Sequence, residues 1–158
     1  MENHESPTSV PAPAPATRTL GALLRLPYRV LAERVYARLG EAGYPEIRPM
    51  HSGLLRNIEP GGTRVTTLAE RAQMTKQSMS AMVDELVRAG YLSVAPDPAD
   101  GRAKRVTLTA RGIALQATLV RLSTEVEAEF AELIGPDRFA QLKELLTAWA
   151  EAYEAPSG

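Results

Sequence analysis

One stretch restricts the fold of this chain more than any other, the residues from Thr67 to Leu108, which read TLAERAQMTKQSMSAMVDELVRAGYLSVAPDPADGRAKRVTL. It predicts a short helix, a tight break, a longer amphipathic helix that ends near Gly90, and two strands around a loop rich in Pro, Asp and basic residues. This order is that of a helix-turn-helix followed by a β-hairpin wing. Such an arrangement can place one helix in the major groove of duplex DNA and a basic loop near the minor groove.

Capping signals predict where the two helices of this stretch begin and end. Thr67 and Glu70 have the spacing of a capping box, so a short helix is expected over residues 67–72. Thr75 can cap the next helix at its N-terminus, and Gly90 can end it. The side of this second helix expected to face inward carries Met79, Met82, Val83, Leu86 and Val87.

The wing is expected to consist of strands at residues 91–94 and 105–109 around a loop from Pro96 to Lys104. Asp100 precedes Arg102 by two residues, and we expect an ion pair between them that holds the loop while Arg102 reaches into the narrow minor groove. A hairpin tip needs Pro, Asp and Gly for its turn geometry in any case. A merely solvated turn is therefore the alternative.

Helical periodicity extends to both sides of this stretch. Apolar residues recur at steps of three and four over residues 18–42, where Pro27 is expected to kink or interrupt the helix. A second helix is expected over residues 49–58, a long one from Ala110, and a last one over residues 137–153. The second of these helices has an apolar face of Met50, Leu54, Leu55 and Ile58.

Composition excludes several classes of site. The chain has 158 residues, enough for one domain with a real core, and no cysteine, so disulfides and thiolate metal sites are impossible. Its only histidines are His4 and His51, which argues against a zinc site. Residues 1–17 read as a disordered, Pro- and Ala-rich tail, and residues 18–158 as a single domain. Without a signal peptide, a membrane span or a catalytic motif, we expect a cytoplasmic protein that is not an enzyme and carries no metal or other cofactor.

Charge is unevenly distributed although the net charge is only −1. Between Thr63 and Ile113 eight basic residues oppose five acidic ones, whereas from Ala114 onward three basic residues oppose eight acidic ones. The middle of the chain can therefore meet phosphate groups, while the C-terminal part faces solvent or another subunit.

These motifs together resemble the MarR family of winged helix-turn-helix transcription regulators. The resemblance is carried by TLAERAQMTKQSMSAMVDELVRAGYL, by the wing pattern DPADGRAKRVTLT, and by the Ala110-Arg111-Gly112 that opens the long helix. It covers nearly all of residues 18–155 and implies a mainly α fold with a small β-hairpin wing and N- and C-terminal dimerisation helices. Family members often carry arginine at the positions of Ala81 and Gly101, where this chain departs from the pattern.

The resemblance implies a homodimer that binds a palindromic operator in double-stranded DNA. The DNA-binding lobe is expected at about residues 49–109, and the dimerisation helices at about residues 18–42 and 110–155. Lys and Gln side chains suit guanine and adenine edges, whereas arginines neutralise phosphates. The DNA contacts that we predict are Arg64, Thr75, Lys76, Gln77, Ser78, Ser80, Arg88, Asp100, Arg102, Lys104 and Arg105, with Arg71 as a further phosphate contact.

Family members often bind a small aromatic or anionic effector between the dimer helices and the winged lobe. The candidates in this chain are Tyr28, Tyr44, Arg48 and His51, with packing or interface roles as the alternative for each. The sequence thus predicts a ligand-responsive repressor. The alternative is a winged-helix protein-interaction module without specific DNA binding.

Overall fold

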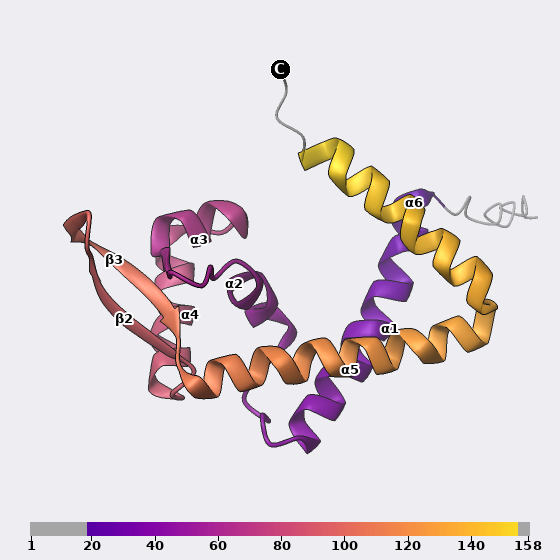
Figure 1. The fold of residues 1–158 in the computed structure, drawn as a ribbon, viewed down its shortest axis with the longest axis horizontal. Helices are drawn as coiled ribbons and strands as arrows, with labels where there is room; N and C mark the ends of the chain where they lie inside the picture. Colours follow the sequence, from indigo (N-terminus) through magenta and orange to yellow (C-terminus); the bar gives the residue numbers. More distant parts are fainter. Residues whose placement is uncertain (1–18, 155–158) are drawn as a thin grey trace, which may run out of the picture.

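The computed structural model describes residues 19–154, and the tail predicted for residues 1–17 lies outside them. A winged lobe lies at one end of a long helix, α5; α1 crosses α5, and α6 extends from its far end (Figure 1). The predicted fold class, mainly α with a small wing, is confirmed. The elements in chain order are α1 (Leu20–Glu41), the 3-10 turn η1 (Pro49–His51), α2 (Ser52–Arg56), β1 (Thr63–Arg64), α3 (Val65–Arg71), α4 (Lys76–Arg88), β2 (Leu92–Asp97), β3 (Asp100–Leu108), α5 (Ala110–Ile134) and α6 (Pro136–Glu154).

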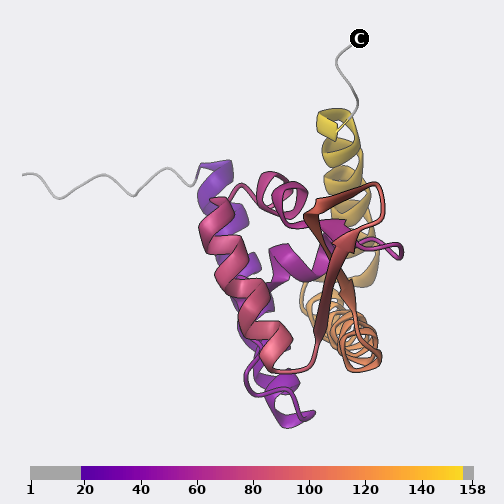
Figure 2. The same ribbon diagram turned by 90° about the vertical axis from the view of Figure 1, so that its left-hand side faces the viewer.

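The lobe packs its helices against one three-stranded antiparallel sheet in the order β1-β3-β2. Thr63 pairs with Val106 and Leu92 pairs with Leu108, so β3 is the central strand. Seen from the end of the lobe, α4 lies on one side and the β2–β3 hairpin on the other (Figure 2). The core between them consists of the buried side chains of Leu54, Leu55, Leu68, Met79, Met82, Leu86, Tyr91 and Val106.

Three helices end with the same backbone turn. Gly43, Gln73 and Gly90, which follow α1, α3 and α4, have φ angles of 99°, 53° and 81°. After each of them the next N–H donates back into the last helical turn, as from Tyr91 N–H to the Leu86 carbonyl at 2.9 Å. The predicted end of the fourth helix at Gly90 is therefore confirmed.

The long helix α5 is buried only along the side that packs against α1 and the lobe. Leu115, Leu122 and Val126 of α5 share a core with Val35 and Leu39 of α1. None of the α6 side chains that the structure describes is buried. No helix within residues 19–154 has the length and apolar character needed to span a membrane.

The third helix begins earlier than the capping box predicts. Helix α3 starts at Val65, its N-cap is Arg64, and no side chain caps it. The start is set by the sheet and the core, because Thr63 pairs with Val106 and Val65 is buried. Thr67 is thus the third residue of the helix, and the capping-box prediction is wrong.

The helix predicted over residues 49–58 is shorter and begins as a 3-10 turn. It ends at Arg56, because the chain then folds back so that Thr63 Oγ1 accepts from the Glu59 N–H at 2.9 Å and donates to the Asn57 carbonyl at 3.1 Å. Ile58 stays buried outside the helix, whereas Met50 is 59% exposed and does not belong to the apolar face.

Of the kink or break predicted at Pro27, the break does not occur, and the predicted loop from Pro96 to Lys104 is wrong. Helix α1 runs through Pro27 as one element, in a part of the helix exposed to solvent, where water can satisfy the carbonyl that proline leaves without a partner. The loop predicted from Pro96 to Lys104 is mostly strand, since β2 extends to Asp97 and β3 begins at Asp100. The turn itself is only two residues long, and the antiparallel register shifts between Pro96 and Asp97.

Candidate nucleic-acid interface

The N-terminus of α4 presents polar side chains to solvent. Thr75 caps it as predicted, with Oγ1 accepting from the Ser78 N–H at 3.1 Å and the hydroxyl donating to Ser78 Oγ at 2.8 Å. Lys76, Gln77 and Ser78 are exposed, and Ser80 is half-buried. Met79, Met82, Val83 and Leu86 fix the opposite side of the helix in the core. This end of the helix therefore combines the positive end of the helix dipole with donors that suit phosphates and base edges.

A buried carboxylate lies at the turn end of the wing hairpin. Asp97, the last residue of β2, is 2% exposed and accepts from Arg64 Nε at 2.6 Å, from Arg105 Nη2 at 3.3 Å and from the Ala99 N–H at 2.8 Å. The hydrogen bond from Arg64, followed by that from the Ala99 N–H, holds the pKa of Asp97 well below its usual range. Asp97 is thus ionised and links all three strands.

The ion pair predicted between Asp100 and Arg102 does not form. Asp100 Oδ1 instead accepts from the backbone N–H of Arg102 at 3.1 Å, and both side chains are exposed. Sequence reasoning missed Asp97, although an aspartate just before a two-residue turn is a known signal for a side chain that accepts from a backbone N–H two residues on.

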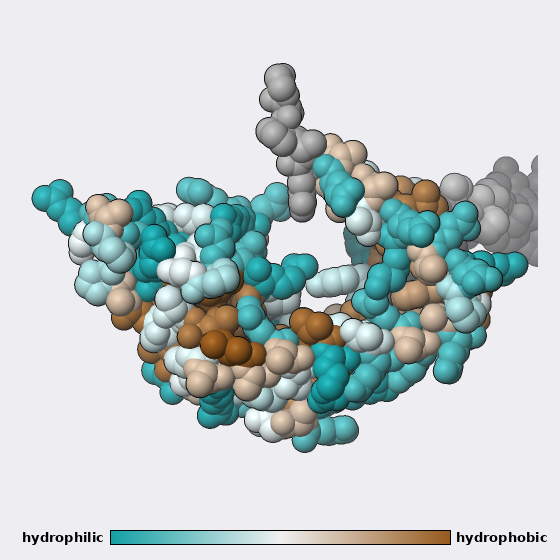
Figure 3. Space-filling view, viewed as in Figure 1, coloured by the Kyte–Doolittle hydropathy of each residue, from teal (hydrophilic) through white to brown (hydrophobic). Residues whose placement is uncertain are grey.

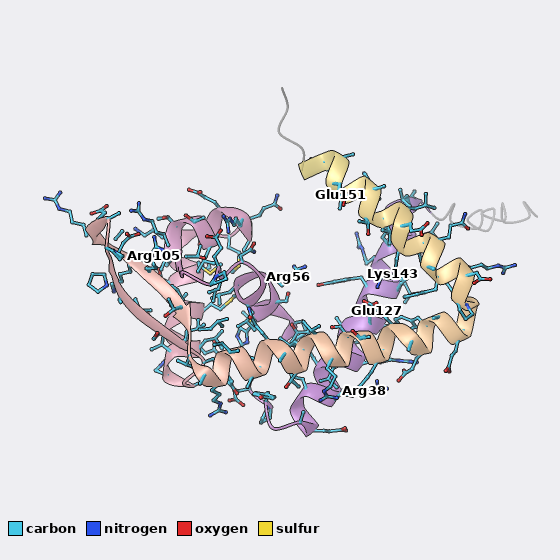
Figure 4. All side chains as sticks on the ribbon, viewed as in Figure 1. Arg38, Arg56, Arg105, Glu127, Lys143 and Glu151 are labelled. Carbon is cyan, nitrogen blue, oxygen red and sulfur yellow. The ribbon has the colours of Figure 1, made fainter. Side chains whose placement is uncertain are left out.

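The basic residues predicted to contact DNA fall into two groups. Some are engaged within the protein: Arg64 and Arg105 with Asp97, Arg71 with Glu59 at 2.7 Å, and Arg88 with the Asp84 carbonyl at 3.2 Å. Arg105 also donates to the Gly61 carbonyl at 2.9 Å and lies near the lobe end of the molecule in Figure 4. Within residues 19–154, Lys76, Arg102 and Lys104 form no ion pair.

His51 is a core histidine. It is fully buried, and its Nδ1 accepts from the Arg48 N–H at 3.2 Å. Its Nε2 lies 3.8 Å from a carboxylate oxygen of Glu85 on α4, too far for a hydrogen bond, and has no other partner in the described structure. Burial lowers the pKa of His51, and the negative charge of Glu85 opposes this effect.

The four candidate effector residues lie in different surroundings. Tyr28 is 62% exposed on α1, whereas Tyr44 packs its ring 6.0 Å from the ring of the buried Tyr91. Arg48 is exposed beside the buried His51. Two surface hollows, one along the start of α1 and one along the end of α6, contain none of the four. Within residues 19–154, no group of three or more His, Asp or Glu side chains is placed to hold a metal ion.

Comparison with known families supports the interpretation of the lobe as a MarR-type winged helix-turn-helix. Residues 47–103 match the model of the MarR family, which confirms the predicted resemblance over this part of the chain. MarR-family regulators are DNA-binding transcription factors and not enzymes, in agreement with the prediction for this chain. No curated protein matches the sequence.

Solved structures show the same fold over most of the chain. The reduced form of MarR from E. coli is 22% identical, with a TM-score of 0.72, and the match covers 82% of this chain and 95% of that one. The MepR–DNA complex of S. aureus is 22% identical, with a TM-score of 0.64 and coverage of 85% and 98%. PcaV from Streptomyces coelicolor, solved with its natural ligand, is 23% identical, with a TM-score of 0.64 and coverage of 90% and 99%.

Proposed function

Since the winged lobe of this chain matches the MarR family and the chain shares the fold of MarR structures, we propose that the protein is a homodimeric transcription regulator that binds a palindromic operator in duplex DNA. The observation that carries the proposal is the start of α4. There Thr75 caps the first turn of the helix, and Lys76, Gln77 and Ser78 are exposed to solvent. The MepR structure was solved bound to DNA, which supports the same use of this fold here.

In this proposal each lobe makes two kinds of contact. The start of α4 enters the major groove, where Gln77 suits an adenine edge and Lys76 suits guanine or a phosphate. The wing meets the minor groove through Arg102, with Lys104 on nearby phosphates. Thr75, Ser78, Ser80 and Arg88 then serve as backbone contacts that fix the position of α4 on the duplex.

The homodimer is supported by the apolar side chains that one chain leaves exposed. On α6, Leu145 is 65% exposed and Trp149 is 51% exposed, and on α1 Leu23 and Leu26 are 47% and 54% exposed. Apolar surface is visible in this region of α1 and α6 among polar residues (Figure 3). Exposed apolar side chains on the terminal helices mark an interface in a soluble protein, and dimerisation by both terminal regions would cover them.

We also propose that the protein acts as a repressor released by a small aromatic or anionic effector. PcaV was solved with its natural ligand, which supports effector binding by a protein of this fold. An effector that binds one spacing of the two lobes more tightly than another would shift the population that fits the operator. Tyr28, Tyr44 and Arg48 remain candidates for this site, whereas the burial of His51 favours its alternative role in packing.

The rival function is a winged-helix module that uses α4 to bind another protein. DNA binding through phosphates has a steep salt dependence because condensed counterions are released from the duplex, and a protein partner carries no such condensed counterions. The near-neutral net charge of −1 and the small Ala81 at the exposed side of α4 are the observations that favour the rival.

A selection experiment separates the two functions. Duplexes enriched from a random-sequence library on the purified protein are labelled, and binding is measured by fluorescence anisotropy over a salt series with unselected duplex as competitor. We expect a palindromic consensus, two protomers per duplex and affinity that falls steeply with salt. Arg102→Ala should weaken binding while the protein stays folded. Enrichment of no consensus, or salt-independent binding, would favour the protein-interaction module.

A further inference from the structure

Asp97 is an unusual residue for the surface that we propose for DNA, because it brings a negative charge to the wing. Its carboxylate is nonetheless buried, and its hydrogen bonds come from β1, from β3 and from the hairpin turn. A buried carboxylate is tolerated only when its charge is paired and its oxygens accept hydrogen bonds. Arg64 and Arg105 fulfil this requirement, so these two guanidinium groups are committed within the protein.

The strand register explains why the wing needs an anchor at this position. Ala95 pairs with Arg105 and Pro96 pairs with Lys104, but the next pair is Asp97 with Asp100, so residues 101–103 have no partner on β2. Pro96 also has no N–H to donate to the ladder. The stretch that contains Arg102 therefore bulges out of the ladder between the Pro96–Lys104 and Asp97–Asp100 pairs, and Asp97 is the β2 residue paired on the turn side of this bulge.

The anchor continues into the turn that precedes β1. Arg105 donates to the Gly61 carbonyl at 2.9 Å as well as to Asp97 at 3.3 Å. Gly62 has a φ of 84°, and a Cβ built on it would lie 2.6 Å from Thr107 Cγ2, so the turn and β3 approach as closely as a glycine allows. Asp97 thus connects the wing to a part of the lobe with little freedom to move.

We propose that Asp97 is a positioning residue, which sets the direction of the wing by holding Arg64 and Arg105 and thereby places Arg102 at the minor groove. This inference rests on the proposed function, since it concerns how the wing meets DNA. It reassigns two arginines that were predicted as phosphate contacts. Arg64 and Arg105 contribute to affinity through the shape of the wing rather than by neutralising phosphates.

The proposal predicts that removal of the Asp97 charge weakens DNA binding, whereas charge alone predicts stronger binding. Loss of a negative charge from a DNA-binding surface strengthens binding when charge alone matters. If Asp97 positions Arg102, Asp97→Asn should instead weaken binding to the most enriched library duplex by about five- to tenfold, which lies within the range for residues coupled through shared contacts. Asp84→Asn is the matched control, because it removes the same charge from an exposed site of α4 and should cause no loss of affinity.

A double-mutant cycle tests whether Asp97 acts through Arg102. Affinities of the wild type, Asp97→Asn, Arg102→Ala and the double variant are measured by anisotropy, and urea unfolding checks that each is folded. We expect the double variant to bind no more weakly than Arg102→Ala alone, because a wing without Arg102 gains nothing from its position. Unchanged or tighter binding by Asp97→Asn, or additive losses in the double variant, would overturn the proposal.

Arg64→Gln tests the same anchor from the other side if Asp97→Asn proves unstable. If Arg64 instead neutralises a phosphate, this substitution would reduce the salt slope of binding by about one, whereas loss of positioning weakens binding and leaves the slope unchanged. A reduced slope would overturn the proposal. If Arg102→Ala binds the enriched duplex as tightly as the wild type, the proposed role of the wing itself is wrong and this inference falls with it.

Discussion

At the scale of single residues, the most unusual group is the buried His51 at the junction of η1 and α2. Its Nδ1 accepts a hydrogen bond from the Arg48 N–H, which fixes the neutral ring with its proton on Nε2. Protonation of Nδ1 would break this bond and place a charge in the core. Burial therefore lowers the pKa of His51, and the Glu85 carboxylate opposes that effect only in part.

This pKa shift predicts a loss of stability in mild acid. The unfolded chain binds the His51 proton near its ordinary pKa of 6.5, and the folded protein binds it only at lower pH. The contribution of neutral His51 to the free energy of unfolding is therefore complete above pH 6.5. It decreases as the pH falls toward the folded pKa, by at most about 1.4 kcal/mol per pH unit for one proton. His51→Gln removes this contribution. Urea unfolding at about pH 7.5 and about pH 5.5 should show the gap between wild type and variant narrow in acid, and a constant gap would contradict the pKa shift.

At the scale of elements, the junction between the lobe and α5 is held by a cluster that spans the chain. Tyr91 donates its hydroxyl to Glu46 at 2.6 Å, and Arg111 donates to Glu46 at 3.0 Å and to the Tyr91 oxygen at 2.9 Å. The Arg111 guanidinium also lies 4.5 Å from the centre of the Tyr91 ring. Burial is the main cause that raises the pKa of Tyr91 to about 12, so its hydroxyl stays a donor at neutral pH.

Gly112 allows the two elements to meet at this junction. A Cβ on Gly112 would lie 2.2 Å from the Tyr91 carbonyl oxygen, which already accepts from the Thr109 N–H at 3.0 Å. Gly112→Ala should therefore lower the free energy of unfolding by about 1–3 kcal/mol, as expected for overpacking. Gly40→Ala is the matched control, since its Cβ would be 3.8 Å from Pro45 and alanine favours a helix. Urea unfolding measures the free energy of unfolding of both variants. Equal effects of the two substitutions would contradict the close approach of Gly112 to the Tyr91 carbonyl.

Local signals predicted most elements and the exposed start of α4, because caps and helical periodicity depend on near neighbours. Thr75, Gly90 and the break between α5 and α6 are examples. The contacts that organise the candidate site were missed because they join distant parts of the chain, as between Arg64 and Asp97. Two aspartates flank the same turn, and the local sequence does not indicate which of them reaches β1.

At the scale of the whole molecule, α6 is attached to the rest of the chain along one side only. Lys143 pairs with Glu127 of α5 at 2.6 Å, and the two lie close together in Figure 4. On α1, Arg34 and Arg38 both bind Glu129, so acidic residues of α5 form ion pairs within the chain. Leu145 and Trp149 of α6 are 65% and 51% exposed, so residues 19–154 leave this part of α6 uncovered. A second chain is the occupant that the proposed function predicts for it.

Leu145→Glu should convert the proposed dimer into a folded monomer. Leu145 is 65% exposed in the single chain, so the substitution leaves the fold of one protomer intact, whereas an unpaired charge buried between two protomers costs about 3 kcal/mol, roughly a hundredfold in the dimer dissociation constant. Thr147→Glu is the control, because a residue two positions further along a helix points nearly the opposite way.

Sedimentation at several concentrations measures the dissociation constants of the dimer, and anisotropy measures binding to the enriched duplex. The variant should lose both dimerisation and tight operator binding, while the control keeps both. An unchanged dissociation constant for Leu145→Glu would mean that this face of α6 does not form the interface, and a monomer that still binds the palindrome tightly would contradict the dimeric mode of DNA binding.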